Sequence, residues 1–433
     1  MKRHDWAVLD VRARQRVLLR PARRRNAEVR ETVRRIFDEV EAEGEAAVHR
    51  WSARLDGRVP EQLRLDGPTV SGARGALGRE DLEALEFAAA NIRGYHAADR
   101  PPDSRRAVLA GTQFVRVWRP LACVGLYIPG GTAPLFSTLL MLAIPAACAG
   151  TAERIAVTPP ARQGGAHPMM IAAAAACGLH SLWLVGGAQA IAAMAFGAGL
   201  SRVDKIFGPG NAYVAEAKRY AAELPGGPAI DLPAGPSELL VIADETASPV
   251  LVAADLLSQA EHDADAQVLL VTTSPELVQA VSIEIERQLE TLPRAAIARA
   301  ALENAAAILV RTVREATDLS NLYAPEHLSL QTADPESLLP HIDRAGTVFA
   351  GPWAAEAFGD YVAGPSHVLP TDGAARCWPG VSVGSFMTSF VVQRVEREGA
   401  ALMAAPAARL ARLEGLEAHA RAADARAKIS PDR

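Results

Sequence analysis

The chain has 433 residues, of which 49% are hydrophobic, 22% are charged and only 5% are aromatic. These proportions are typical of a globular protein, and the length predicts two or three core-forming units. A net charge of −5 gives no electrostatic basis for a nucleic-acid partner. The four cysteines form no C-x-x-C pair, so neither a zinc ribbon nor a disulfide framework is indicated.

The N-terminal segment is predicted to lack a core of its own. Residues 1–25 are basic, and we expect them to form a solvated, irregular arm. No long apolar run follows Met1, and Asp5 and Asp10 argue against a transit peptide, so the cytoplasm is the expected location. Helical periodicity then predicts helix within 26–56 and again over 79–99, which together would form a helical cap.

Strand-like segments that end in Gly or Pro alternate with Ala-rich helical segments from about residue 120. Strands are expected at 123–128, 154–158, 181–185, 205–207, 238–243, 267–272, 307–310, 327–331 and 347–350. This alternation predicts an α/β protein with two parallel-sheet lobes, joined near residues 225–237. Ligands are expected beyond the carboxyl ends of the strands. The uncharged stretches 121–152 and 163–201 are interrupted by Pro and Gly, which favours buried α/β units over membrane spans.

Gln259 and His262 are the first candidates for chemistry. They lie three residues apart near the end of an apolar run that predicts a buried helix, so they project from one helical face. An amide oxygen and an imidazole on one face can share a metal ion without bringing charge. An isolated Q-x-x-H pair is more often structural, so the pair alone leaves both interpretations open.

Two further pairs stand at a predicted strand end and in a loop. Glu326 and His327 come just before a strand and could form an acid–base couple, although adjacent Glu and His are more often a surface pair. Asp360 and His367 lie in an expected loop over 359–367. There the carboxylate could simply stabilise a turn.

The remaining candidates are Ser237, in the turn between the lobes, and Glu414 and His419, near the C-terminus. Residues 400–428 predict an amphipathic helix or helix pair, on which solvated charge is the ordinary interpretation. The sequence has no H-E-x-x-H, no P-loop, no G-x-S-x-G and no standard dinucleotide fingerprint. The residues alone therefore predict a two-lobed α/β protein with an oxygen and nitrogen metal site, without naming a reaction.

Seven longer motifs together resemble the histidinol dehydrogenase family. They are, in order, VGLYIPGGTAPLFSTLLMLAIPA (124–146), VGGAQAIAAMAFG (185–197), VDKIFGPGN (203–211), AGPSELLVIAD (234–244), DLLSQAEHD (255–263), APEHL (324–328) and FGDYVAGPSHVLPT (358–371). The resemblance runs from about residue 30 to 420. It implies a zinc-dependent homodimer that oxidises L-histidinol to L-histidine in two steps through L-histidinal, using NAD, as the last step of histidine biosynthesis.

The resemblance also implies a role for each candidate residue. The Zn²⁺ ligands, for one ion per subunit, would be Gln259, His262, Asp360 and His419. His327 would be the base that removes the alcohol proton, and Glu326 would activate water to hydrate the aldehyde. The substrate contacts would be Ser237, Gln259, His262, His327, Asp360, Glu414 and His419, with His367 nearby. The NAD contacts would be Tyr127, Gln189 and Asn211, each at a strand end.

The family fold implies two incomplete, doubly wound Rossmann-like lobes with a helical N-terminal segment. Residues 26–119 and 236–381 are expected to form the first lobe, with the metal and catalytic residues. Residues 120–235 are expected to form the second lobe, with the NAD contacts. The tail, 382–433, is expected to serve in dimerisation and to complete the site of the partner subunit.

Two alternatives differ in what the site would need. A related zinc- and NAD-dependent dehydrogenase could act on another small amino alcohol or diol, and the small departure at Ser366, where many relatives carry Asn, leaves room for it. A zinc hydrolase would have no use for nucleotide contacts, and a non-catalytic binding protein would have none for Glu326 beside His327.

Overall fold

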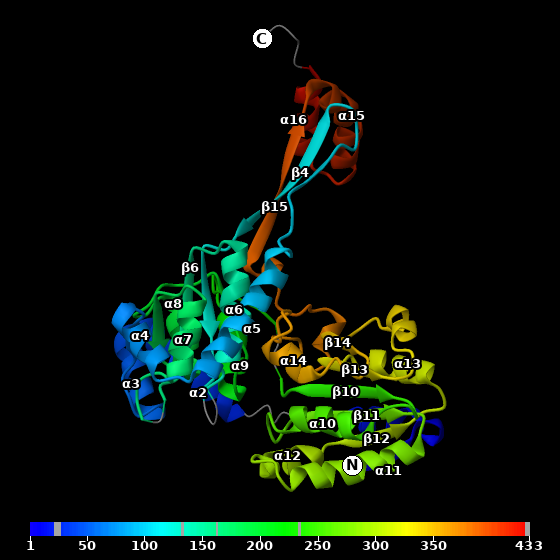
Figure 1. Ribbon diagram of the computed structural model, residues 1–433. Coiled ribbons are helices and arrows are strands. Elements are labelled where there is room, and N and C mark those ends of the chain that lie inside the picture. Colours follow the sequence, from blue (N-terminus) through cyan, green and yellow to red (C-terminus); the bar gives the residue numbers. More distant parts are fainter. Residues whose placement is uncertain (21–26, 131–133, 162, 233–234, 429–433) are drawn as a thin grey trace. The chain divides into compact units, whose positions relative to one another are not determined.

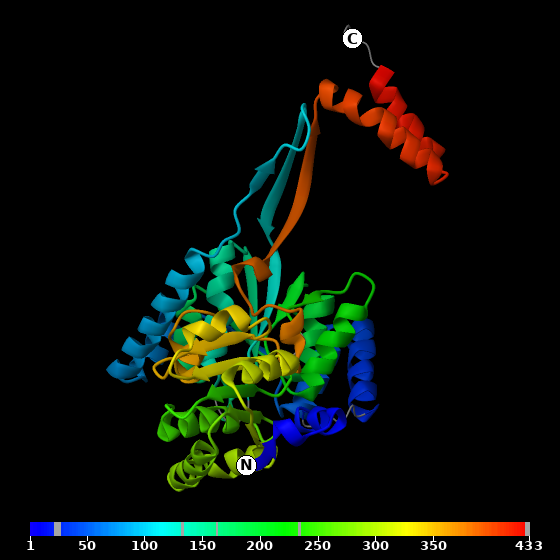
Figure 2. The ribbon, with the colours of Figure 1, turned by 90° about the vertical axis from the view of Figure 1, so that its right-hand side faces the viewer.

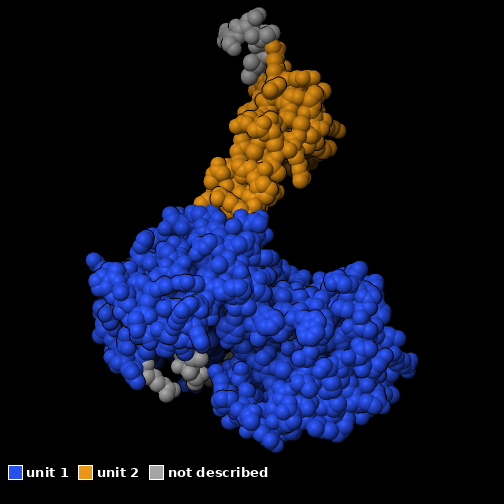
Figure 3. Space-filling view, viewed as in Figure 1, with its two compact units in different colours: residues 1–99, 121–386 blue, residues 100–120, 387–433 orange. Residues whose placement is uncertain are grey.

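The computed structural model describes residues 1–20, 27–130, 134–161, 163–232 and 235–428. The chain forms two compact units, the first comprising Met1–Asp99 and Leu121–Phe386, the second Arg100–Pro120 and Met387–Arg433 (Figure 3). Two expected segments extend outside the described residues: the end of the N-terminal arm at 21–25, and 233–234 in the turn between the lobes.

The first unit contains two six-stranded sheets (Figure 1). Sheet I has the strand order β2-β7-β6-β5-β8-β9, with β2 antiparallel to β7 and the other pairs parallel. Its strands are β2 (Glu61–Arg64), β5 (Cys123–Tyr127), β6 (Glu153–Thr158), β7 (Ser181–Leu184), β8 (Lys205–Phe207) and β9 (Ala229–Ile230). Sheet II has the order β1-β12-β11-β10-β13-β14, with every pair parallel. Its strands are β1 (Lys2–Asp5), β10 (Glu238–Ala243), β11 (Gln267–Thr272), β12 (Ala306–Leu309), β13 (His327–Gln331) and β14 (Thr347–Ala350). The expected α/β class is confirmed.

Helices lie against both sheets (Figure 1). Those of sheet I are α6 (Phe136–Ala149), α7 (Pro168–Ala176), α8 (Gly187–Phe196) and α9 (Ala212–Glu223). Those of sheet II are α10 (Pro249–Ala260), α11 (Pro275–Leu289), α12 (Ala295–Leu302), α13 (Val313–Tyr323), the 3-10 helix η2 (Glu336–His341) and α14 (Glu356–Tyr361). Two further 3-10 turns, η3 (Ala374–Arg376) and η4 (Val383–Phe386), follow. The Ser274 hydroxyl caps α11 by accepting from the Leu277 N–H at 3.1 Å.

The central strands β10 and β11 of sheet II have apolar sequences because both of their faces are covered. Every residue of β10 and β11 is buried. Leu239 and Val241 join a core with α10, α11 and α12, whereas Leu240 and Ile242 join a second core with Trp6 and α13. Alternate side chains of one strand therefore fill opposite faces of the sheet. Among the described residues, no helix is long and apolar enough to cross a membrane.

The N-terminal helices pack against the helices of sheet I. They are α2 (Ala27–Glu43), α3 (Glu45–Leu55), α4 (Gly67–Gly75) and α5 (Arg79–Ala97). Phe37 of α2 and Trp51 of α3 lie in one core cluster with Tyr127 and Val157 of sheet I. This packing differs from the expected grouping of residues 26–119 with 236–381, because an amphipathic helix does not indicate in its own sequence which sheet its apolar face will meet.

The expected irregular arm is partly regular. Residues Lys2–Asp5 form β1, which pairs with β12 at the edge of sheet II, and a 3-10 turn η1 (Trp6–Val8) and helix α1 (Val11–Val17) follow. Trp6 is buried in the core between these elements and α13. The prediction was wrong here because an edge strand pairs through its backbone, so the polar sequence Lys-Arg-His-Asp carries no apolar alternation.

The second unit joins two distant segments of the chain. Strands β3 (Ser104–Arg106), β4 (Thr112–Pro120) and β15 (Met387–Val395) form an antiparallel sheet. Helices α15 (Arg397–Leu413) and α16 (Glu417–Lys428) follow and pack against each other (Figure 2). Gly111 and Gly399 meet so closely that a Cβ on Gly111 would lie 2.6 Å from the Gly399 nitrogen. The predicted C-terminal helix pair is present as α15 and α16. Helix α15 has three exposed leucines, Leu402, Leu410 and Leu413.

Candidate active site

A group of potential metal ligands lies where α10 ends. Gln259 lies in the last turn of α10, and His262 follows the C-cap residue Glu261, with its N–H donating to the Gln259 carbonyl at 3.3 Å. The side chain of Gln259 is buried, and its Oε1 accepts no hydrogen bond from any described residue. A buried polar atom without a partner is costly, so this oxygen fits the ligand of a cation.

Helix α14 contributes two carboxylates to the same place. Asp360 Oδ2 lies 3.6 Å from His262 Nε2. Glu356 precedes Asp360 by four residues, so the two side chains share one face of the helix. One ligand atom from each of His262, Glu356 and Asp360 lies within 4.8 Å of the others. The expected loop over 359–367 is thus wrong at its start, since Asp360 lies within the short helix Glu356–Tyr361.

The two carboxylates of α14 have different electrostatic environments. Glu356 is buried, and neither carboxyl oxygen has a hydrogen-bond partner among the described residues. Burial raises the pKa of Glu356 well above its ordinary value, and Asp360 raises it further. Burial also opposes ionisation of Asp360, but His262 and the neighbouring imidazoles outweigh it and lower the pKa of that carboxyl. An amide oxygen, an imidazole and carboxylates make a donor set that fits Zn²⁺, and a cation there would partner the orphaned oxygens.

The adjacent Glu326 and His327 are buried at the start of β13, so the surface-pair alternative does not apply. His327 Nδ1 lies 3.1 Å from the carbonyl oxygen of Glu238. A carbonyl can only accept, so Nδ1 carries the proton and Nε2 keeps its lone pair. Burial lowers the pKa of His327 to about 4. The imidazole is therefore neutral near pH 7 and can accept a proton at Nε2.

Glu326 is held by the same neighbouring residue. Its Oε2 accepts from the backbone N–H of Glu238 at 2.9 Å and lies 3.6 Å from His327 Nδ1. Burial raises the pKa of Glu326 well above its ordinary value, while the bond from Glu238 opposes that rise. A buried carboxyl with a raised pKa is suited to exchange a proton with a bound water molecule or substrate.

Two further side chains form hydrogen bonds beside this site. Asp255, one helical turn before Gln259, accepts from Gln331 Nε2 of β13 at 2.8 Å. Burial raises the pKa of Asp255 to about 6. The Nδ1 of His367 lies 2.8 Å from the Asp360 carbonyl oxygen, which gives His367 the same Nδ1–H tautomer as His327.

These residues gather at the amino ends of the strands of sheet II. Ser237 and Glu326 immediately precede β10 and β13, and His327 is the first residue of β13. Helix α10 runs back along the sheet and ends at the same edge, where the negative end of its dipole favours a cation. The candidate residues of sheet II therefore lie at the edge opposite the carboxyl ends where ligands were expected, because they stand where α10 ends and where the chain enters β10 and β13.

The three predicted NAD contacts lie at the carboxyl ends of the strands of sheet I. Tyr127 is the last residue of β5, and its hydroxyl accepts from the Gly187 N–H at 3.2 Å. Gln189 lies in the first turn of α8 and donates to Asp56 Oδ2 at 3.0 Å, while its buried Oε1 has no partner among the described residues. Asn211 is the N-cap of α9 and accepts from the backbone at its helix start. Two helix N-termini at this edge suit the phosphates of a dinucleotide.

The remaining two candidates, Glu414 and His419, belong to the second unit. Glu414 is the C-cap residue of α15, and His419 lies in the first turn of α16. Both are exposed within the chain. Their part in the site stays a prediction.

Several groups at the two edges were missed from the sequence. They are the buried Glu356, Glu238 and Asp255 and the partly buried Asp56. For Glu356 a signal was present, because Glu356 and Asp360 are spaced by four and would share a helical face. For the other three, only their burial and partners identify them.

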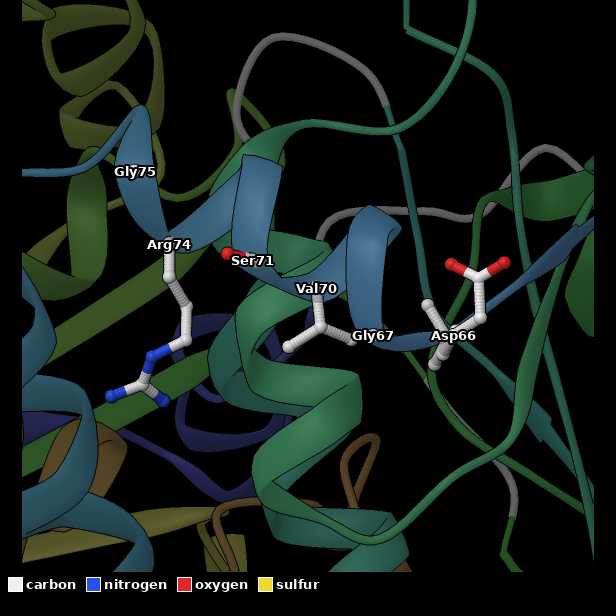
Figure 4. Close-up of a pocket in the computed structure, with 7 residues that line it drawn as sticks. Asp66, Gly67, Val70, Ser71, Arg74 and Gly75 are labelled. Atoms are coloured by element: carbon white, nitrogen blue, oxygen red, sulfur yellow. The ribbon is translucent and has the colours of Figure 1, made fainter.

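A pocket of about 670 Å³ beside α4 lies apart from these residues in the sequence and has different chemistry (Figure 4). Its two charged lining side chains are already engaged. Asp66 accepts from the Thr69 N–H at 2.9 Å as the N-cap of α4, and Arg74 pairs with Glu86 at 2.6 Å. The pocket therefore contributes no catalytic group.

Comparison with known proteins points to one family. The sequence profile of the family described as histidinol dehydrogenase matches residues 19–427. The histidinol dehydrogenase of Xylella fastidiosa (strain Temecula1) is 46% identical over 432 residues, covering 100% of both chains. That of Vibrio parahaemolyticus is 43% identical, covering 96% of each chain. The crystal structure of histidinol dehydrogenase from Elizabethkingia anophelis superposes with a TM-score of 0.94 at 38% identity, covering 99% of this chain and 98% of that one.

Proposed function

This chain belongs to the histidinol dehydrogenase family, and from that premise we propose that it oxidises L-histidinol to L-histidine through L-histidinal. Family membership makes it an NAD-dependent oxidoreductase of histidine biosynthesis. The single observation that carries the proposed chemistry is the geometry of His327: a buried imidazole whose Nδ1 faces the Glu238 carbonyl, so that Nε2 keeps its lone pair.

The metal of this proposal is one Zn²⁺ per subunit, held by Gln259, His262 and Asp360 together with His419. The orphaned Oε1 of Gln259 and the grouping of His262 with Asp360 support it. When bound, the ion would fix the imidazole and amine of the substrate in place, the template role of a metal ion. The C-terminal end of α10 would favour the same positive charge.

In the first oxidation, His327 Nε2 accepts the proton of the substrate hydroxyl. The hydride of the same carbon passes to NAD⁺, whose nicotinamide is the electron acceptor of the reaction. The Nδ1–H bond to Glu238 keeps the ring in the tautomer that this step needs. Because burial holds the pKa of His327 near 4, the base is unprotonated at physiological pH.

In the second oxidation, Glu326 takes a proton from the water molecule that adds to the aldehyde. The proton that His327 gained in the first oxidation passes to the aldehyde oxygen as the water adds, so the hydrated aldehyde has a hydroxyl that the neutral His327 can deprotonate. The second hydride would pass to a second NAD⁺. Glu326 and His327 are neighbours in sequence and share a partner in Glu238, so one pair of side chains can serve both half-reactions.

The rest of the proposal concerns binding and assembly. Ser237 and Glu414 would contact the substrate beside the metal ligands, and Tyr127, Gln189 and Asn211 would contact NAD. The protein would be a homodimer in which Glu414 and His419 complete the site of the partner subunit. The exposed leucines of α15 and the exposed Phe390 of β15 support an apolar interface on the second unit.

The test is the stoichiometry of the purified protein. Two NAD⁺ should be reduced for each L-histidinol consumed, since two hydrides leave the same carbon. A strong chelator should abolish the activity, and Zn²⁺ should restore it. A ratio of one NAD⁺ per substrate, or no oxidation of histidinol by zinc-loaded protein, would refute this function.

A further inference from the structure

Glu238 contacts both proposed catalytic residues through its backbone. Its N–H donates to Glu326 Oε2 at 2.9 Å, and its carbonyl oxygen lies 3.1 Å from His327 Nδ1. The orientation of Glu326 and the tautomer of His327 therefore both depend on how residue 238 is held. As the first residue of β10, it lies at the end of the ladder, where the sheet constrains it least.

The side chain of Glu238 is held by three donors on the far side of this contact. Arg20 donates to both carboxylate oxygens, from Nε at 2.5 Å and from Nη2 at 2.8 Å. The backbone N–H of Asp372 donates to Oε1 at 2.7 Å. The carboxylate is only 3% exposed, so it has no water shell to replace a lost partner. A two-pronged guanidinium contact also fixes the orientation of the carboxylate, which a single bond would not.

Arg20 is itself fixed to sheet II. Its guanidinium lies 4.0 Å above the ring of Tyr323 and donates to the Tyr323 carbonyl at 3.0 Å. The Tyr323 hydroxyl donates to Gln267 Oε1 at 2.8 Å, and Gln267 Nε2 donates to the carbonyl of Leu19 at 3.2 Å. This closed ring of contacts brings the N-terminal segment against the amino ends of β10 and β11.

We propose that Arg20 and Glu238 form a positioning pair for the reaction, which holds Glu326 and His327 in their working orientations through the backbone of residue 238. The inference rests on the proposed roles of those two residues. Without Arg20, the buried Glu238 carboxylate would keep one donor, the Asp372 N–H, and would turn toward solvent to regain partners. This movement would rotate the peptide groups on both sides of residue 238, which carry the contacts to Glu326 and His327.

The test compares Arg20→Met with Arg14→Met. Arg14 lies on the same N-terminal segment, donates twice to the Trp6 carbonyl and stacks on the Trp6 ring, but makes no contact with Glu238. Removing either arginine should weaken the packing of the N-terminal segment and lower the Tm of the protein. Only Arg20→Met should lower kcat, by roughly 10- to 100-fold, the scale of a misplaced catalytic group.

The pattern of the kinetic change separates positioning from general damage. In Arg20→Met, kcat should fall by a similar factor with L-histidinol and with L-histidinal, because both Glu326 and His327 depend on Glu238. The KM for NAD⁺ and the zinc content should stay within about twofold of the unmodified protein, since neither site includes Arg20 or Glu238. Arg20→Lys, with the charge but not the planar fork, should give an intermediate kcat.

A second readout needs no substrate. The ¹⁵N shifts of the His327 ring should report the Nδ1–H tautomer in the unmodified protein and in Arg14→Met, and a mixture with Nε2–H in Arg20→Met. An unchanged tautomer, or a kcat for Arg20→Met within twofold of that for Arg14→Met, would overturn the proposal. If Arg20→Met does not fold, Arg20→Lys and the near-isosteric Glu238→Gln answer the same question. Should the unmodified protein not oxidise histidinol, the proposed function fails, while the tautomer comparison still decides the role of Arg20.

Discussion

Replacing Lys218 with Met should both destabilise the protein and weaken NAD binding. Lys218 of α9 and Asp231 form an ion pair at 2.5 Å whose side chains are only 3% and 1% exposed. The pair holds both polar groups of Gly208: Lys218 Nζ donates to the Gly208 carbonyl at 2.7 Å, and the Gly208 N–H donates to Asp231 Oδ2 at 2.7 Å. Gly208 has a φ of +113°, and a Cβ there would lie 2.0 Å from the Tyr127 carbonyl oxygen.

The expected magnitude follows from the groups left behind. Lys218→Met leaves a buried carboxylate without its counter-ion, which costs about 3–5 kcal/mol in comparable sites. Asp231 would keep the backbone donors of Gly208 and Leu232, so we expect the lower part of that range. The turn from Gly208 to Asn211 would also lose its anchor. Because Asn211 is a proposed NAD contact, the KM for NAD⁺ should rise several-fold more than the KM for histidinol.

Urea unfolding and steady-state kinetics measure both effects. Arg219→Met is the matched control, because Arg219 is next on the same helix but is exposed and pairs with Glu216 and Glu223, contacts worth less than about 1 kcal/mol each. In the double variant Lys218→Met/Asp231→Asn no charge is left unpaired, so about 2 kcal/mol should return. The reasoning would be refuted if Lys218→Met cost no more than Arg219→Met, or if the double variant were less stable than the single one.

Two further predictions concern Asp255, which lies beside the proposed metal ligands, and the proposed assembly of two subunits. Asp255→Asn should stabilise the zinc-free protein above pH 4. Burial raises the pKa of Asp255 to about 6 in the folded protein, compared with about 3.9 in the unfolded chain. The unmodified protein therefore loses stability as the pH rises from about 3.9 to 6, because the buried carboxyl must ionise. Urea unfolding across this pH range measures how much more stable the Asp255→Asn variant is than the unmodified protein. This difference should reach about 3 kcal/mol near pH 6 and then stay level. A difference that does not change with pH would contradict the prediction. Mixing a His419→Ala chain with a Glu326→Ala/His327→Ala chain should recover activity, because a heterodimer would have one intact site. No recovery despite confirmed subunit exchange would count against a shared site.

The parallel strands could be predicted closely from the sequence. The bounds expected for 238–243, 267–272, 327–331 and 347–350 match β10, β11, β13 and β14. Strands β10 and β11 are covered on both faces, so their burial is visible in the sequence as apolar runs. Gln259 and His262 could be paired for a similar local reason, since three residues span less than one helical turn.

Only the tertiary structure decided which distant groups meet. Burial of Glu356 without a partner and the contact of Arg20 with Glu238, 218 residues apart, depend on how sheet II and its helices pack. The same is true of β1, whose polar sequence becomes a strand only because β12 offers its edge. Local sequence determines periodicity and turn chemistry, whereas desolvation and long-range hydrogen bonding depend on neighbours that only the folded chain supplies. The sequence alone therefore predicted most strands of the two parallel-sheet lobes, the proximity of Gln259 and His262, and the family, and the fold decided the amino edge of sheet II on which the candidate site is built.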